Sequence, residues 1–347
     1  MTLLQAIWWI SILMAVLAVL IMAVLIVRRL IIQRRQVWWK NRKTKLSSVV
    51  FNHMENPDSI TSIKGDLSDK DMGLIQEIVR ELMGTVSGTM KANLLKLLTL
   101  VGGLESAITA VNSSNERQRF NAIDTLVLFN NQQSIDTLIR VLDDPYPRIR
   151  LAAAGALVKM GAHIPVHQLI EKLGVNSGIR PRLLREVFRQ IAPRSVPEIL
   201  EILKTNDQES VHELLIDALG AANDYSAVDV LVAEMASSKL NIRAEVMRSL
   251  AAIGHPSALP AVLKGLKDDA WEVRTQAAIC AGRIGLPEVM PNLIQLLDDD
   301  RWWVRFRSAG ALKKFGPEGL NKLKEISVGS SPAAKIASLV LSEGKPV

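Results

Sequence analysis

Residues 273–305 read VRTQAAICAGRIGLPEVMPNLIQLLDDDRWWVR, and the Val273-Arg274 pair that opens this stretch returns at its end as Val304-Arg305. A second column, twelve residues after each motif hydrophobe, holds Asn or Gly in every copy except one. Repeats of about 30 residues indicate stacked units, none of which can bury its apolar face alone. The motif arginines are Arg119, Arg150, Arg243, Arg274 and Arg305, and the second column is Asn130, Gly161, Ala192, Asn223, Gly254, Gly285 and Gly316.

Each unit contains two helical patterns. In one copy Val273, Ala277, Ala281 and Ile284 form an apolar stripe at helical spacing, and the residues after Gly285 begin a second stripe. Two columns of large apolar residues therefore predict the core of a helix-turn-helix solenoid. They are Leu126, Leu157, Phe188, Leu219, Leu250, Ala281 and Leu312 on the first helices, and Leu138, Leu169, Leu200, Leu231, Val262 and Leu293 on the second.

This pattern resembles the HEAT repeats, particularly the short bacterial form related to the phycocyanobilin-lyase type. The resemblance covers roughly residues 84–330 and lies in Asp143-Asp144 with Arg150, Asp268-Asp269 with Arg274, and Asp299-Asp300 with Arg305. It implies an all-α fold, a right-handed α-solenoid of about seven to eight helix pairs with terminal caps over residues 70–347. It also implies that Arg274 pairs with an acidic residue at the end of a neighbouring second helix. Function does not follow, because such solenoids serve many ends.

The N-terminus predicts a membrane anchor. Residues 3–27 are apolar apart from Gln5 and Ser11, and at about 1.5 Å per residue they are long enough for a hydrocarbon layer of about 30 Å. We therefore expect one transmembrane helix within residues 1–27, before the solenoid. A cleaved signal peptide is the alternative, but no basic segment precedes the run and no clear cleavage site follows it.

A basic segment, residues 28–45, follows and contains eight Lys or Arg and no acid. By the positive-inside rule we expect a single-pass inner-membrane protein with its N-terminus outside and its solenoid cytoplasmic. The segment could contact anionic lipid headgroups or form a solvated stalk. Residues 46–69 read as a linker. The expected membrane-surface residues are Arg28, Arg29, Arg34, Arg35, Trp38, Trp39 and Lys40.

Charge and motifs argue against several functions. The net charge of +7 comes from residues 1–45, since the rest of the chain has 34 basic and 35 acidic residues, so we expect no nucleic-acid partner. The sequence contains no phosphate-binding loop, nucleophile elbow or metalloprotease helix. His163 and His167 lack further ligands for a metal, and Cys280 shares a column with small residues, so we expect a packing role for it. We predict no enzyme activity, cofactor, metal or small-molecule substrate.

Two groups of residues differ from the repeat background and are candidate protein-binding sites. One is Trp271 with Trp302 and Trp303, which could form an interface or fill the groove between stacked units. The other is a group of arginines in the unit where Pro181 replaces the motif Arg, which could be a contact surface or a solvated face. Those arginines are Arg182, Arg185, Arg189 and Arg194.

These features predict a membrane-anchored cytoplasmic scaffold that binds proteins. The expected partner is a membrane complex, for example a bacterial envelope or polysaccharide-synthesis assembly in which this chain is a non-catalytic subunit. The alternative is a HEAT-type bilin or cofactor lyase, or a chaperone-like relative, which would be expected to be soluble and to have a ligand cleft.

Overall fold

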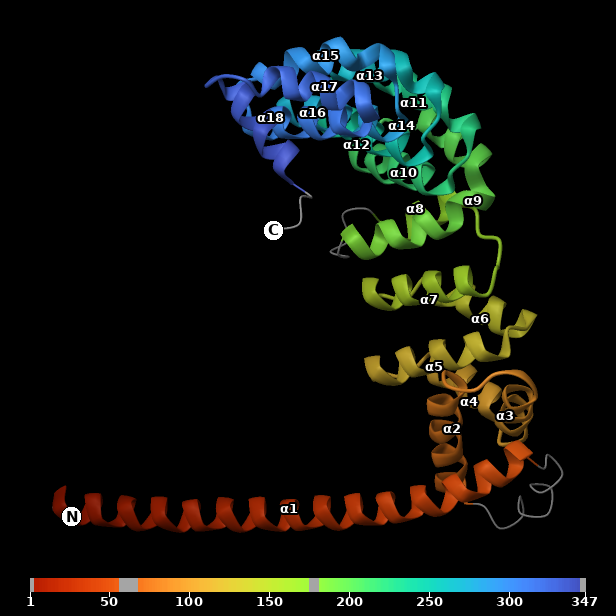
Figure 1. Ribbon diagram of the computed structural model, residues 1–347. Helices are drawn as coiled ribbons and strands as arrows, with labels where there is room; N and C mark the ends of the chain where they lie inside the picture. Colours follow the sequence, from red (N-terminus) through yellow and green to blue (C-terminus); the bar gives the residue numbers. More distant parts are fainter. Residues whose placement is uncertain (1–2, 56–67, 175–180, 344–347) are drawn as a thin grey trace. The chain divides into compact units, whose positions relative to one another are not determined.

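The computed structural model describes residues 3–55, 68–174 and 181–343, apart from some side chains of the first two helices. Within these residues the regular elements are helices and no strand is present (Figure 1). The chain divides into two compact units, residues 1–134 and 135–347. Each unit has its own core, and each is described by itself.

The first unit contains α1 (Leu3–Glu55), α2 (Asp69–Met83), α3 (Gly88–Leu100), α4 (Gly103–Ala110) and α5 (Glu116–Phe129). Its core joins Leu46 and Val50 of α1 to Ile75 of α2 and Leu94 of α3. Ser68 caps α2 and forms a capping box with Asp71. The carboxylate of Asp71 also accepts two hydrogen bonds from the Arg42 guanidinium, at 2.7 and 2.8 Å. The C-terminal part of α1 is therefore part of the folded unit.

The expected transmembrane helix is wrong. In the part of the chain that the structure describes, no helix is long and apolar enough to cross a membrane. The apolar run forms no element of its own, because α1 continues without interruption through the basic segment and residues 46–55 to Glu55. Reading the run by itself ignored the charged residues of the same helix. The single-pass inner-membrane location, with the N-terminus outside, depended on that span and is wrong with it.

The second unit is a stack of helix pairs. The first helices of four successive pairs begin at Glu209, Leu240, Trp271 and Trp302, at one constant interval that equals the repeat period of the sequence. The helices of the unit are α6 (Gln132–Val141, which begins in the first unit), α7 (Pro147–Lys159), α8 (Val166–Leu173), α9 (Pro181–Thr205), α10 (Glu209–Ala222), α11 (Val228–Glu234), α12 (Leu240–Ile253), α13 (Leu259–Gly265), α14 (Trp271–Ile284), α15 (Met290–Gln295), α16 (Trp302–Lys314), α17 (Gly316–Ile326) and α18 (Pro332–Ser342), with short 3₁₀ turns η3 (Tyr225–Ala227), η4 (Pro256–Ala258), η5 (Pro287–Val289) and η6 (Leu296–Asp298).

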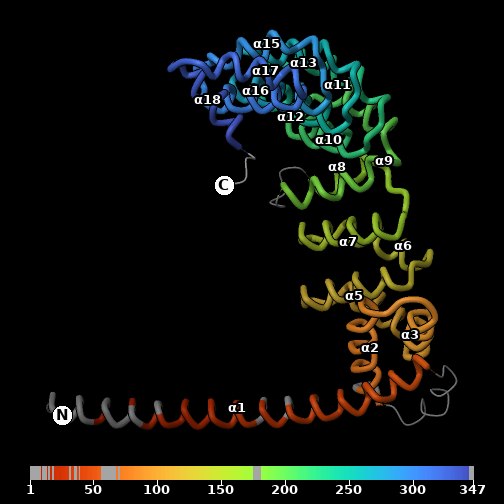
Figure 2. Tube along the Cα trace, in the orientation of Figure 1, coloured from red at the N-terminus to blue at the C-terminus, as the bar shows by residue number. Residues whose placement is uncertain are grey.

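These helices form two rows (Figure 1). The first helices α9, α10, α12, α14 and α16 pack against one another in succession, and α11, α13 and α15 each pack against the first helix of the next pair. The Cα trace runs back and forth between the rows (Figure 2). A solenoid of this kind buries one continuous core between its rows, and the sequence prediction of an all-helical solenoid is confirmed for the described residues.

The predicted core columns are buried. All seven residues of the first-helix column, from Leu126 to Leu312, have no exposed surface, and the same holds for five of the six in the second column. Only Leu200 differs, since it is half-buried. The Gly and Asn residues after the first helices take the left-handed conformation, with φ between 45° for Asn130 and 78° for Gly285, which allows a helix to end there.

Ala192 explains why Leu200 differs from the rest of its column. It occupies the column of Gly and Asn, yet the chain does not turn there, and α9 continues for 25 residues through Pro193 and Pro197. An alanine disfavours the left-handed conformation that ends the other first helices. Because the helix continues, its second half keeps the register of the first, and Ile199 is buried in place of Leu200.

Candidate protein-binding site

The loops between successive pairs share one turn. A side-chain oxygen in the loop accepts a hydrogen bond from the backbone N–H two residues later, which fixes the start of the next first helix. Six residues in equivalent positions of the repeat do this: Ser113 to Asn115 (3.1 Å), Asp144 to Tyr146 (2.8 Å), Asn206 to Gln208 (2.9 Å), Ser237 to Lys239 (3.3 Å), Asp268 to Ala270 (2.9 Å) and Asp299 to Arg301 (2.8 Å).

The motif arginines hold the same loops from the helix side. In four of the five, Nη1 donates to the backbone carbonyl six residues earlier, at 2.9 Å for Arg150, 3.0 Å for Arg243, 2.8 Å for Arg274 and 2.7 Å for Arg305. His212 occupies the same column, and its Nε2 contacts the carbonyl of Asn206 in the same way. A side-chain donor thus recurs in this column and is usually arginine, although Pro181 supplies none.

Two of these arginines also bind a carboxylate at the end of the second helix of their own pair. Arg243 donates to both oxygens of Asp268 at 2.7 and 2.8 Å, and Arg274 donates to both oxygens of Asp299 at 2.7 and 3.1 Å. The expected pairing of Arg274 with an acidic residue at the end of a second helix is confirmed, but that helix belongs to its own pair and not to a neighbouring unit. Burial raises the pKa of Asp268, but hydrogen bonds from Arg243 and from the Ala270 N–H outweigh burial, and its pKa lies below the ordinary value.

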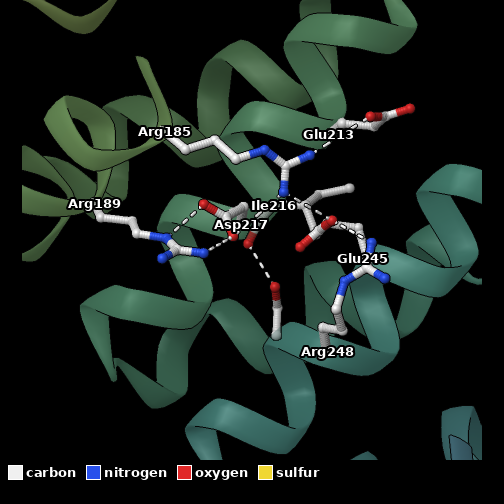
Figure 3. A network of polar contacts seen from close by, with 8 residues as sticks. Arg185, Arg189, Glu213, Ile216, Asp217, Glu245 and Arg248 are labelled. Carbon is white, nitrogen blue, oxygen red and sulfur yellow. Dashed lines mark hydrogen bonds and ion pairs between the residues drawn. The ribbon is translucent and has the colours of Figure 1, made fainter. Parts of the chain in front are cut away.

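The arginine group of α9 contacts carboxylates on the next two first helices (Figure 3). Arg189 donates to both oxygens of Asp217 on α10, at 2.7 and 2.5 Å. Arg185 lies 3.1 Å from Glu245 of α12 and 3.6 Å from Asp217. The side chains of Asp217 and Glu245 are only 6% and 2% exposed, so these arginines neutralise buried charge.

The network joins three first helices. Arg248 of α12 also binds Glu245, and Arg185 lies 3.7 Å from Glu213. Three arginines thus contact three carboxylates. All of these residues except Glu213 line a cavity of about 360 Å³. The sequence prediction missed Asp217 and Glu245. Their signal was spacing, because Asp217 follows Arg189 by slightly less than one repeat period.

The other two predicted arginines lie outside this network. Arg182 is exposed. A guanidinium nitrogen of Arg194 lies near Gly161, 3.3 Å from where a Cβ would stand on that glycine. The structure therefore brings together only Arg185 and Arg189 of the four.

An exposed aromatic cluster lies at the start of α16. Trp302 and Trp303 are 43% and 49% exposed, with their rings edge to face at 4.8 Å. Trp302 also stacks on Phe306 with 4.9 Å between ring centroids. The guanidinium of Arg307 lies 5.7 Å from the Trp303 ring and from the Phe306 ring. Trp271 is half-buried at the start of α14, with Arg301 at 6.0 Å from its ring.

The repeat itself does not require these aromatic rings. The positions of Trp302, Trp303 and Phe306 correspond on α12 to Leu240, Asn241 and Ala244, none of which is aromatic; Leu240 and Asn241 are exposed and Ala244 is buried. The sequence prediction missed Phe306, although its spacing of three and four from the tryptophans places it on the same helix face. This cluster is the strongest candidate for a protein-binding site.

The other residues considered in the sequence analysis are the metal-ligand candidates, Cys280 and the cations and tryptophans of α1, and they do not form one common site. In the described part of the chain, no group of three His, Cys, Asp or Glu could hold a metal. Burial raises the pKa of the Cys280 thiol to about 12, so the thiol stays protonated and packs as a small residue. On α1, Arg28, Arg29, Arg34, Trp38 and Lys40 are exposed. The side chains of Arg35 and Trp39 lie outside the described residues.

Several solved structures resemble the chain at low sequence identity. An engineered protein shares 16% identity over 86% of this chain and 95% of its own (TM-score 0.37), and YIBA_ECOLI shares 15% over 71% and 95% (TM-score 0.40). Kap121p bound to Pho4p shares 11% over 82% of this chain (TM-score 0.47). The chain spans 38% of the length of Kap121p.

No curated protein sequence matches the chain. The family described as HEAT repeats matches residues 104–177, 196–279 and 260–339, which together make up more than half of the chain. Nothing in this match indicates the bilin-lyase type. On these matches and the repeat geometry above, the chain belongs to the HEAT-repeat family.

Proposed function

We propose that this chain is a non-catalytic scaffold that binds a protein partner through the aromatic cluster of Trp302, Trp303 and Phe306. The observation that carries the proposal is the clustering of the two tryptophans, which are 43% and 49% exposed, with Phe306 on one helix. Tryptophan and arginine are enriched among the residues that dominate binding energy at protein interfaces. A cluster of both on one helix face suits such an interface.

The solenoid supplies the rest of the surface. HEAT-type units stack into extended arrays, so a partner can contact several loops or helices without any catalytic chemistry. Trp271 and Arg301 belong to the adjacent loop and helix start. They extend the aromatic and cationic surface from α16 to α14.

Capture of a partner from the native cell extract tests the proposal. The tagged full-length chain should retain a specific protein, and the double change Trp302→Ala with Trp303→Ala should abolish that retention. Tyr225→Ala is a matched control, because Tyr225 is 61% exposed and contacts an aromatic ring, His255, in the same unit. Circular dichroism should show both variants folded. Retention that survives the double change, or that Tyr225→Ala abolishes equally, contradicts the proposal.

The identity of the retained protein tests the finer proposal. We propose a subunit of an envelope or polysaccharide-synthesis assembly, and mass spectrometry of the captured material would identify it. Recovery of unrelated proteins only, in amounts that the tryptophan changes do not alter, would remove this partner class.

The exposed cations of α1 support a second, peripheral contact with anionic lipid headgroups. Arg28, Arg29, Arg34 and Lys40 are exposed on the helix that also exposes Trp38, and cations interleaved with an indole suit a lipid surface. The full chain should sediment with phosphatidylglycerol vesicles more than with phosphatidylcholine vesicles. Changing Arg28, Arg29 and Arg34 to Gln should remove that difference. Equal sedimentation with both vesicles would exclude the contact.

A further inference from the structure

Arg305 is the last of the motif arginines, and it lacks the carboxylate partner that Arg243 and Arg274 have. Arg243 is followed by Asp268 and Arg274 by Asp299, each 25 residues later, and each aspartate fills the fork formed by Nε and Nη2. The same step from Arg305 leads to Ser330, which is exposed. The chain therefore supplies no carboxylate at the position that completes the other two forks.

Arg305 nevertheless has the orientation of the other two. Its Nη1 donates to the carbonyls of Asp299 and Asp300 at 2.7 and 3.2 Å, as that of Arg274 does to Asp268 and Asp269 at 2.8 and 3.0 Å. Its Nε, however, is buried and has no acceptor among the described residues. A buried charged donor without an acceptor is unfavourable, and a guanidinium fork is shaped for a carboxylate.

The helix that carries Arg305 also carries positive charge and apolar surface. Trp302 and Trp303 lie on the same helix, and Arg301 and Arg307 are exposed beside them. The loop between α17 and α18, which contains Ser330, also carries Val328, 85% exposed. Apart from Asp299, whose carboxylate already binds Arg274, the acidic residue nearest to α16 in sequence is Asp300, and it is exposed.

We infer that the Arg305 fork binds a carboxylate of the partner, within an acidic segment whose apolar side chains pack on Trp302, Trp303 and Phe306. The inference rests on the proposed function and names the class of its partner, a segment with Asp or Glu flanked by apolar residues. Because Ser330 holds the position that Asp268 and Asp299 hold in the preceding repeats, the bound carboxylate lies beside the loop at residues 327–331.

Binding of synthetic peptides to the full chain tests the carboxylate. The probe is a twelve-residue peptide with a central Asp flanked by Leu and Phe, and its control is the same peptide with Asn. The Asp peptide should bind at least about tenfold more tightly, as expected when a hydrogen-bonded charge pair replaces a neutral one. Arg305→Lys keeps the charge but not the fork, and it should remove that preference. Equal binding of the two peptides would overturn the inference.

A carboxylate that the chain itself supplies to the Arg305 fork gives a second test, which does not depend on destabilising the protein. Ser330→Asp places the carboxylate where the column has it, so the variant should melt at a higher temperature and lose the preference for the Asp peptide. Val328→Asp adds the same charge to the same loop outside the column and should do neither. An unchanged Tm and unchanged peptide preference in Ser330→Asp would overturn the inference.

Failure of the inference and failure of the proposed function give different results. If Trp302→Ala with Trp303→Ala abolishes partner capture but Arg305→Lys and Ser330→Asp leave it unchanged, the aromatic cluster binds the partner and the fork does not. If the tryptophan changes have no effect on capture, the proposed function itself fails.

Discussion

Arg274 of α14 donates to both carboxylate oxygens of Asp299, a residue that also accepts the backbone N–H of Arg301. The two side chains are 17% and 7% exposed. One aspartate thus fixes the end of one helix pair and the start of the next first helix. The order of the stack in this part of the solenoid depends on a contact between side chains and loops as well as on the apolar core.

Removing this arginine should destabilise the fold. Arg274→Ala leaves the largely buried Asp299 carboxylate without its charge-assisted bonds, and we expect a loss of about 1.5 to 3 kcal/mol in the free energy of unfolding. Arg283→Ala is the control, since Arg283 is an exposed arginine on the same helix. Urea titration followed by circular dichroism measures both. Equal midpoints for the two variants would show that the Arg274 pair adds nothing to stability.

The Arg243 and Asp268 pair predicts how stability depends on pH. The pKa of Asp268 is lower in the folded chain than its ordinary value of 3.8, so folding favours the deprotonated carboxyl. Its contribution is complete above about pH 5 and is lost as the pH falls through the folded pKa. Asp268→Asn should therefore lower stability at pH 7 and reduce the further loss between pH 5 and pH 3. If the free energy of unfolding changed with pH in the same way for the wild type and the variant over this range, the prediction would be contradicted.

The arginines of α9 should separate into two classes. Arg189→Gln leaves Asp217 buried with only Arg185 nearby, and we expect a loss of roughly 1 to 2 kcal/mol, at the lower end for such pairs because Arg189 is 46% exposed. Arg182→Gln, on the same helix and exposed, should change the midpoint by less than about 0.5 kcal/mol. Thermal unfolding of both variants makes the comparison, and a larger effect for Arg182 would refute it.

Much of the second unit could be predicted because the period aligns equivalent positions. The apolar columns and the Gly and Asn column follow from the constant interval between equivalent residues, whereas the pairing of Arg274 was implied by the resemblance to the HEAT repeats. The fused helix α9 was not predicted, since Ala192 and its two following prolines look like an ordinary break in sequence. The network of Arg185 and Arg189 was also missed, because its carboxylates lie on other helices and only the stacking of the helices brings them within reach.

The first helix shows a different limit. Residues 3–27 are apolar enough in sequence to predict a separate membrane span, whereas the structure places them in one helix with a charged segment and with Leu46 and Val50 of the first core. A window of hydropathy measures composition and does not show where a helix ends. The candidate site was partly predicted through Trp302 and Trp303, and Arg305 was singled out only as a motif residue.

Backbone conformation at the helix ends gives a prediction that needs no partner. Gly254 has φ 73°, and a Cβ there would meet nothing within 4 Å, so only the backbone opposes a side chain. Gly254→Ala should cost about 1 to 2 kcal/mol, whereas Gly254→Asn should cost less, since Asn130 and Asn223 adopt the same conformation in the same column. Chemical denaturation of both variants measures the difference. An alanine variant as stable as the asparagine variant would contradict the assignment.

At His212 and Ser237 the repeat lacks the pair of a motif arginine and an aspartate, and two substitutions can introduce it. His212 stands in the arginine column, and Ser237 stands one repeat before Asp268, in the column that Asp268 and Asp299 share. His212→Arg supplies the fork, and Ser237→Asp supplies the carboxylate while keeping an oxygen for the Lys239 N–H that Ser237 now binds. Either change alone introduces one member of the pair without the other, so the double variant should be more stable than the sum of the single effects.

The coupling should be about 1 kcal/mol or more, within the range measured for residues in one ion-pair network. Glu234 requires a control, because its carboxylate lies 3.5 Å from His212 Nδ1 and could take the new arginine instead of the new aspartate. The cycle is therefore repeated with Glu234→Gln in all four chains and followed by urea unfolding. A coupling that persists in this background assigns the pair to positions 212 and 237, and a coupling near zero in both backgrounds would show that the column does not determine the pairing.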